Sequence, residues 1–223
     1  MSEKCNELHK IFNNIKKLTF PFNDRDIPLD GIYILFEKGE LAHGTNRIVR
    51  IGTHTGKNQL VSRLKQHFIK ENKDRSIFRK NIGRCILNRE KDSFLDKWEL
   101  DLTTREAKEK YSALIDFEKQ NQIEKKVTDY IQNNFSFVVF PVIDKEKRIH
   151  LESKIISTVS LCDECKRSDK WLGFYCPNKE LQSNRTYKNC LKIRESGLWL
   201  VNELYKKPLS DQNMIELRTI LEI

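Results

Sequence analysis

The stretches Asp30-Gly-Ile-Tyr-Ile-Leu-Phe36 and Arg47-Ile-Val-Arg-Ile-Gly52 decide how this 223-residue chain folds. Both are short, rich in β-branched residues and bounded by turn-type residues, so we expect two paired strands. Successive side chains of a strand point to opposite faces. The residues that we expect to face the core are Ile32, Ile34, Phe36, Val49 and Ile51. The same alternation then brings Tyr33 and Arg50 together on the opposite face.

A helix is expected directly after this hairpin, near residues 58–70. Leu60, Leu64 and Phe68 recur at i, i+4 and i+8, which is the spacing of one apolar helix face. Arg63 and His67 lie one helical turn apart beside that face. We therefore expect their two side chains to point the same way.

These segments resemble the GIY-YIG nuclease superfamily. The first motif, Gly31-Ile-Tyr33, is intact, whereas the second reads Arg50-Ile-Gly52, with Arg50 where a tyrosine usually stands. The runs Gly52-Thr-His54, Arg63-Leu-Lys-Gln-His67 and Ser76-Ile-Phe-Arg79 are similar to a restriction-endonuclease-like branch, some members of which tolerate a basic residue in the second motif. The resemblance implies an α/β (α+β) fold, with a small mixed or antiparallel β-sheet flanked by helices and additional helices at both ends.

The resemblance also implies hydrolysis of phosphodiester bonds with one divalent metal ion, Mg²⁺ or Mn²⁺. Arg63, helped by Arg50, would stabilise the negative charge of the transition state. Glu152 would bind the metal, because it lies beside the apolar stripe of a predicted helix that contains Leu151, Ile155 and Val159. An asparagine often completes such sites, and the candidates are Asn178, Asn184 and Asn202.

The base that activates the attacking water has several candidates. The resemblance assigns this role to Tyr33, although an ordinary tyrosine has a pKa of about 10 and needs help from positive charge. Arg50, His54 and His67 can supply that help. A neutral His54 or His67 can also take the proton from water directly, while His54 can equally do no more than close a turn.

Positive charge is concentrated just after these motifs. The formal net charge is +9, and residues 57–91 hold eleven Lys or Arg against three acidic residues. Neutralised phosphates release counterions, so a polyanion is a natural partner, although a solvated basic face is the alternative interpretation. We expect an exposed loop and short helix over residues 71–81. The basic side chains expected to contact nucleic acid are Lys65, Arg75, Arg79 and Lys80.

The chain is expected to consist of a core with two extensions. We assign residues 1–26 to an N-terminal helical extension, 27–160 to the nuclease core and 161–223 to a cysteine-containing C-terminal extension packed on the core. The apolar run Phe135-Ser-Phe-Val-Val-Phe140 has few residues that favour water, so it predicts a central strand.

A helical insertion into the core is expected near residues 103–133. Thr103 and Glu106 have the spacing of a capping box, and a loop near 116–121 is expected to interrupt the helix.

The cysteines indicate a separate hypothesis. Cys162, Cys165, Cys176 and Cys190 could bind a structural zinc ion, although their spacing matches a zinc ribbon only in its first half. Otherwise they are reduced thiols buried as small apolar groups.

Composition excludes several classes of protein. The charged N-terminus lacks the apolar stretch of a signal peptide, and no apolar run is long enough for a membrane span. A cytoplasmic location is therefore expected. Together with the basic segment, the resemblance implies a metal-dependent DNA endonuclease of restriction or defence type. Such a protein could act as a monomer or as a homodimer. The alternatives are a nucleic-acid-binding protein of the same fold with weakened catalysis and a zinc-stabilised interaction protein.

Overall fold

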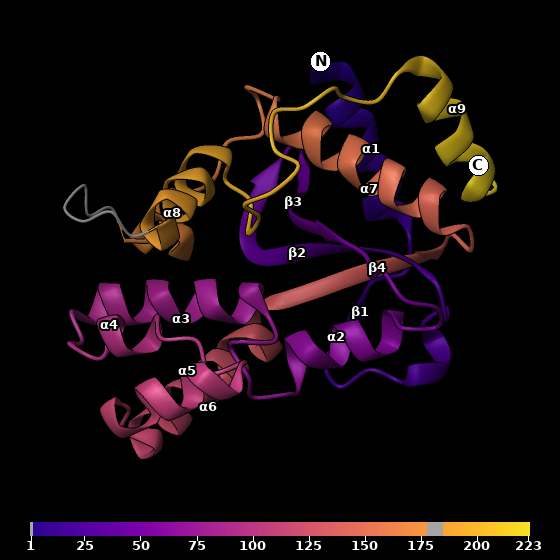
Figure 1. The fold of residues 1–223 in the computed structure, drawn as a ribbon. Helices are drawn as coiled ribbons and strands as arrows, with labels where there is room; N and C mark the ends of the chain where they lie inside the picture. Colours follow the sequence, from indigo (N-terminus) through magenta and orange to yellow (C-terminus); the bar gives the residue numbers. More distant parts are fainter. Residues whose placement is uncertain (1, 178–184) are drawn as a thin grey trace.

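The computed structural model of the chain describes residues 2–177 and 185–223, and its elements are arranged around one sheet (Figure 1). The described elements, in chain order, are α1 (Ser2–Asn14), β1 (Leu18–Thr19), η1 (Asp24–Asp26), β2 (Gly31–Ala42), β3 (Thr45–Gly52), α2 (Leu60–Phe68), α3 (Ile77–Glu90), α4 (Leu95–Trp98), α5 (Arg105–Tyr111), η2 (Ser112–Leu114), α6 (Phe117–Asn134), β4 (Phe135–Pro141), α7 (Lys145–Ser160), η3 (Leu172–Tyr175), α8 (Arg185–Ser196) and α9 (Asp211–Ile220). The fold is mixed α and β, which confirms the predicted class.

The sheet has four antiparallel strands in the order β1-β4-β2-β3. The predicted hairpin is therefore β2 and β3, which pair directly. β4 contains the apolar run 135–140 and lies between β1 and β2, so the prediction of a central strand is confirmed.

Helices cover both faces of this sheet. α1, α7 and α9 lie over one face, and α2, α3 and α6 lie over the other (Figure 1). Two apolar clusters correspond to these layers, one containing Tyr33 and Leu35 and the other containing Ile32 and Ile34. Both sets of β2 side chains are thus buried, because each face packs against helices.

A β-bulge in the hairpin changes one predicted orientation. Leu35 pairs with Arg50, but the next partner of Phe36 is Ile48, so Val49 is an extra residue in β3. Val49 belongs to the same cluster as Tyr33, not to that of Ile51. The prediction that Val49 and Ile51 share a face was wrong, because a bulge breaks the period of two.

The helices after β3 also differ from expectation in their bounds. The predicted short helix in 71–81 is the beginning of α3, which continues to Glu90. The cap at the insertion is Thr104, whose side chain accepts from the Ala107 backbone N–H, so the prediction of Thr103 was wrong by one position. The break in the insertion spans residues 112–116, and α6 already begins at Phe117.

Helices lie at both ends of the chain, as expected, although residues 1–26 also contain β1, which pairs with β4 in the sheet. α1 buries Leu8, Ile11 and Phe12, and α9 buries Met214 and Leu217. Within the described residues, none of the helices combines the length and apolar character that crossing a membrane requires.

Candidate active site

Tyr33 is held by two side chains from other elements. Its phenolic oxygen lies 2.8 Å from His67 Nε2 of α2, and Arg50 Nε of β3 donates to the same oxygen across 3.3 Å. Tyr33 itself has no exposed surface. The prediction that Tyr33 and Arg50 share one surface is confirmed, and His67 joins them from the following helix.

Two motif glycines allow this close packing. A Cβ atom at Gly52 would lie 2.2 Å from the Tyr33 hydroxyl oxygen, and one at Gly31 would lie 2.2 Å from the carbonyl oxygen of Phe140. No side chain fits at such distances. Gly52 therefore lets the Tyr33 ring lie across β3, and Gly31 lets β2 approach β4.

His67 lies between Tyr33 and Ser76. Its Nδ1 is 2.8 Å from Ser76 Oγ, and Ser76 is also the N-cap of α3, accepting from the Arg79 backbone N–H across 3.3 Å. Burial, with the nearby charges of Arg50, Arg63 and Arg79, holds the pKa of His67 well below its usual value. A neutral imidazole has one nitrogen that accepts a hydrogen bond, so His67 Nε2 can accept the hydrogen bond of the Tyr33 hydroxyl.

Arg50 is oriented by the C-terminal segment of the chain. Its Nη1 donates to the carbonyl oxygen of Trp199, and its guanidinium lies over the Phe78 ring, 5.1 Å from the centroid. Trp199 is fixed in turn, because its Nε1 donates to the buried carboxylate of Glu37 across 2.8 Å. These contacts leave Arg50 Nε directed at the Tyr33 oxygen.

Glu152 comes from α7 and lines a surface pocket together with Arg50 and Arg63. Asn81 and Asn202 also line this pocket, which we call the Glu152 pocket. Burial raises the pKa of Glu152 to about 7, although Arg50, a hydrogen bond from the Thr53 backbone and Arg63 act in the opposite direction. The pocket thus holds a half-buried carboxylate beside two arginines.

Asn202 is the asparagine candidate that the structure brings to this pocket. Asn178 and Asn184 lie outside the described residues. Asn81, which we did not single out from the sequence, is 1% exposed and its Nδ2 has no hydrogen-bond partner among the described residues. It is a spare donor at the wall of the Glu152 pocket, and no sequence pattern marks it.

Comparison with known families agrees with this geometry. The GIY-YIG domain matches residues 2–221, which is nearly the whole chain. The chain belongs to the GIY-YIG family. No curated protein and no solved structure matches the chain. The family suggests nuclease activity, and the match includes both segments that we predicted as terminal extensions.

His54, from the second GIY-YIG motif segment, is engaged with the backbone. Its Nδ1–H donates to the Gly56 carbonyl oxygen across 2.8 Å, and its Nε2 accepts from the Gly31 N–H across 3.4 Å. Asp30 Oδ1 lies 3.4 Å from Nε2. Burial lowers the pKa of His54, so the ring is neutral near pH 7. Both ring nitrogens have partners, which favours the turn-closing alternative.

The basic residues of this GIY-YIG protein divide into exposed and buried groups. Arg75 is exposed, and Lys65 is half-exposed and paired with Asp24. Arg79 is completely buried, and its Nη2 lies 2.7 Å from Glu124 Oε2. Lys80 is 8% exposed and donates to the Glu99 carbonyl oxygen across 3.0 Å. The prediction that Arg79 and Lys80 are presented to phosphates was wrong, because both are packed inside against α6 and the segment around Glu99.

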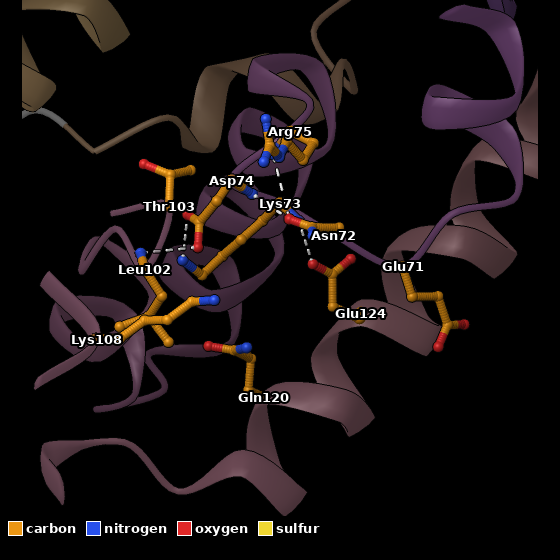
Figure 2. Close-up of a pocket in the computed structure, with 10 residues that line it drawn as sticks. All are labelled: Glu71, Asn72, Lys73, Asp74, Arg75, Leu102, Thr103, Lys108, Gln120 and Glu124. Atoms are coloured by element: carbon orange, nitrogen blue, oxygen red, sulfur yellow. Dashed lines mark hydrogen bonds and ion pairs between the residues drawn. The ribbon is translucent and has the colours of Figure 1, made fainter. Parts of the chain in front are cut away.

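Four pockets on this surface are joined by shared residues. Arg63 lines both the Glu152 pocket and a neighbouring one that contains Gln66. Gln66 lines the next pocket with Lys70 and Arg75, and Arg75 also lines the pocket shown in Figure 2. We call this row of neighbouring pockets the basic groove. Figure 2 shows its far end, where Lys73 is paired with Asp74 and Glu124 accepts from the Lys73 backbone.

The structure separates the four cysteines that we predicted as one zinc set. Cys176 and Cys190 lie with Cys85 in the cluster on the α3 face, whereas Cys165 lies with Cys5 in the cluster on the α1 face. Since the sheet stands between the two clusters, the predicted set of Cys162, Cys165, Cys176 and Cys190 was wrong. Cys162 and Cys165 have other neighbours, described below.

Proposed function

We propose that this GIY-YIG protein is a metal-dependent endonuclease that hydrolyses DNA phosphodiester bonds. The observation that carries the proposal is the hydrogen-bonded set of Tyr33, His67 and Arg50, beside a pocket that both Arg50 and Glu152 line. A proton acceptor, a fixed cation and a carboxylate thus meet at one place. Such a set suits in-line attack of water on a phosphodiester.

The donor set fits a hard divalent cation such as Mg²⁺ or Mn²⁺. Glu152 offers carboxylate oxygens and Asn202 an amide oxygen in the same pocket, and oxygen is the ligand that these ions prefer. A carboxylate whose pKa is raised to about 7 by burial also gains most from a neighbouring cation. When bound, the metal would stabilise the leaving 3′ oxygen as a Lewis acid.

The side chains of this chain would divide the remaining tasks. Tyr33, as the phenolate, would take the proton of the attacking water, while His67, which burial and the nearby charges keep neutral, would hold the Tyr33 oxygen in place. Arg50 Nε would stabilise the phenolate form of Tyr33. Arg63 and the spare Nδ2 of Asn81 would hold the non-bridging phosphate oxygens, where negative charge develops.

The basic groove would bind the DNA backbone. Arg63, Lys70 and Arg75 line it, and both Lys70 and Arg75 are exposed. Contacts from Lys and Arg to phosphates carry little sequence information but provide affinity and register. The groove therefore supports a role in positioning any DNA strand against the Glu152 pocket. A restriction or defence role is a further expectation of the resemblance.

One observation favours the alternative of a DNA-binding protein with weakened catalysis. Tyr33 has no exposed surface, and Arg50 occupies the position of a second tyrosine and donates to the Tyr33 oxygen. Water would reach the phenol only after a side-chain movement. The two functions make different predictions for cleavage, while both predict salt-sensitive binding.

The test is cleavage of supercoiled plasmid and of linear DNA by the purified chain with Mg²⁺, with Mn²⁺ and with a chelator. We expect metal-dependent nicking or cutting that Tyr33→Phe, Arg63→Ala and Glu152→Ala abolish or lower at least about 10²-fold while DNA binding is kept. The matched controls are the exposed residues Tyr175→Phe, Arg105→Ala and Glu146→Ala, which should cleave normally. Tight, salt-sensitive binding without cleavage of any substrate would favour the alternative.

A further inference from the structure

Five side chains of the types that bind metal ions lie on the face of the sheet opposite Tyr33, outside the site described above. Cys5 and His9 come from α1, His43 from the β2–β3 turn, and Cys162 and Cys165 follow α7. One ligand atom each from Cys5, His9, His43 and Cys165 lie within 4.8 Å of one another. Three segments that are distant in sequence therefore converge on one point.

The distances agree with the separation of ligands around one zinc ion. Tetrahedral zinc with bonds of about 2.0–2.3 Å keeps its ligand atoms about 3.3–3.8 Å apart. Cys162 Sγ lies 3.5 Å from His43 Nε2, and Cys5 is within hydrogen-bonding reach of both Cys162 and Cys165. Three thiols and the His43 imidazole thus lie near one another, with Cys162 joined to the group through its contacts with His43 and Cys5.

His9 has a different place in this cluster. Its Nδ1 is 2.9 Å from the Cys5 carbonyl oxygen, and its Nε2 is 3.1 Å from the backbone N–H of Ile48. Both nitrogens therefore have backbone partners, with Nδ1–H donating and Nε2 accepting. Nε2 is also 3.5 Å from Cys165 Sγ. His9 is thus suited to a supporting role beside the ligands.

His43 has the features of a ligand. Its Nε2 lies 3.5 Å from Cys162 Sγ, and its Nδ1 lies 3.8 Å from a carboxylate oxygen of Glu164, which is longer than a hydrogen bond but places a carboxylate on the side of the ring away from Cys162. His43 also adopts a positive φ of 52° in a tight hairpin turn, where Asn and Gly are preferred. Its side chain is only 3% exposed.

We infer that Cys5, His43, Cys162 and Cys165 bind one structural zinc ion, with His9 as a neighbouring positioning residue. The ion would tie α1 and the β2–β3 turn to the end of α7, the helix that carries Glu152. Three thiolates and one imidazole form a closed set of the kind found in structural zinc sites, with no position left for substrate. This inference does not depend on the proposed nuclease activity.

The test is the metal content of the full chain, purified under reducing conditions without a chelator. We expect about one zinc ion per chain, and a near-complete loss of zinc in Cys5→Ser, Cys162→Ser, Cys165→Ser and His43→Asn. Asn is chosen at position 43 because it accepts the positive φ of the turn. The matched controls come from the separate thiol cluster and are Cys85→Ser, Cys176→Ser and Cys190→Ser, which should keep one zinc ion.

Wild-type protein provides a second measurement in case the serine variants do not fold. Cobalt(II) bound in place of zinc should show the absorption of tetrahedral thiolate coordination, and a mercurial reagent should release zinc as it modifies three thiols. Strong chelation should lower the melting temperature by about 5 °C or more. His9→Asn should keep the zinc but raise its dissociation constant about 10–100-fold.

Two results would overturn the inference. A reduced chain that holds no zinc and takes up neither zinc nor cobalt would exclude the site. Loss of zinc in His9→Asn together with full zinc in Cys162→Ser would show that His9, and not Cys162, is the fourth ligand. DNA cleavage is not a readout in any of these measurements, so failure here and failure of the proposed nuclease function are distinguishable.

Discussion

The two halves of the basic segment 57–91 place most of their cations differently in the folded chain, the exceptions being Lys73, which is buried, and Arg89 and Lys91, which are exposed. In the first half, Arg63 lines the Glu152 pocket and Lys70 and Arg75 line the groove that continues from it. In the second half, Arg79 and Arg84 are buried and paired with acidic residues. The basic residues of this segment therefore supply both a surface for phosphate and part of the protein interior.

The difference arises from where α3 lies. Residues 57–75 include α2 and the loop that follows it, whereas α3 packs against α6 and η3, so its cations need internal partners. Glu124 of α6 and Glu99, after α4, supply them, with Arg84 Nη2 2.7 Å from Glu99 Oε2. A buried cation beside a carboxylate is structural, and an exposed one beside a pocket is available to DNA.

The largest effect that would test this comparison is expected at Arg79. Arg79→Met should lower the free energy of unfolding by about 3–5 kcal/mol, because it leaves the Glu124 carboxylate buried without its partner. Urea denaturation followed by circular dichroism measures the change. The double variant Arg79→Met/Glu124→Leu should recover part of the loss, since it removes both charges. A single variant as stable as wild type would mean that the pair does not form.

Arg63→Ala should lower cleavage and leave stability nearly unchanged, which is the reverse of the effect of Arg79→Met on stability. If Arg63 holds the phosphate, its loss should lower the cleavage rate about 10²–10³-fold, because one fixed donor to the transition state is removed. The melting temperature should differ from that of wild type by no more than about 2 °C, because Arg63 is at the surface of the groove. Single-turnover cleavage and thermal unfolding measure the two effects. Equal losses of stability in Arg63→Ala and Arg79→Met would remove the distinction between the halves.

The sequence predicted the first half of the comparison better than the second. Tyr33 and Arg50 meet because strand periodicity and a hairpin bring them together, and Arg63 and His67 follow from helical spacing. No periodicity links Arg79 to Glu124, forty-five positions away. The same holds for Cys5 and Cys165, which become neighbours only because α1 packs near the end of α7. Packing between distant elements decides these pairs.

Glu152 provides a pH-dependent test of the pocket that the exposed half lines. Its folded pKa of about 7 lies above the ordinary value of 4.5, so ionisation of Glu152 destabilises the fold. The destabilisation is absent below about pH 4.5 and complete above about pH 7. Glu152→Gln should therefore raise stability by about 1–2 kcal/mol at pH 8, after allowance for solvent screening, and by much less at pH 4.5. Thermal unfolding at the two pH values measures this.

Glu203, in the same pocket, is the control for Glu152. Lys206 and Ser153 lower its pKa, so its ionised form stabilises the fold above its ordinary pKa. Glu203→Gln should consequently lower stability at pH 8, which is the opposite sign. If both variants shift stability in the same direction, burial of Glu152 is not the cause of its raised pKa. Metal-dependent cleavage by wild type should also fall as pH falls through about 7, because protonated Glu152 binds a cation poorly.

The smallest expected effect is on the salt dependence of DNA binding, and it separates the two halves directly. Lys70→Ala and Arg75→Ala should each reduce the slope of log affinity against log salt by about 1, because each removes one phosphate contact. Lys80→Met, from the buried half, should leave the slope unchanged, since Lys80 Nζ donates to the Glu99 carbonyl oxygen and not to solvent. Lys10→Ala, on the exposed side of α1, is the surface control and should also have no effect. Fluorescence anisotropy at salt concentrations from about 50 to about 200 mM measures the slopes. A reduced slope for Lys80→Met would mean that α3 turns outward on DNA, and the basic groove would then include the second half as well.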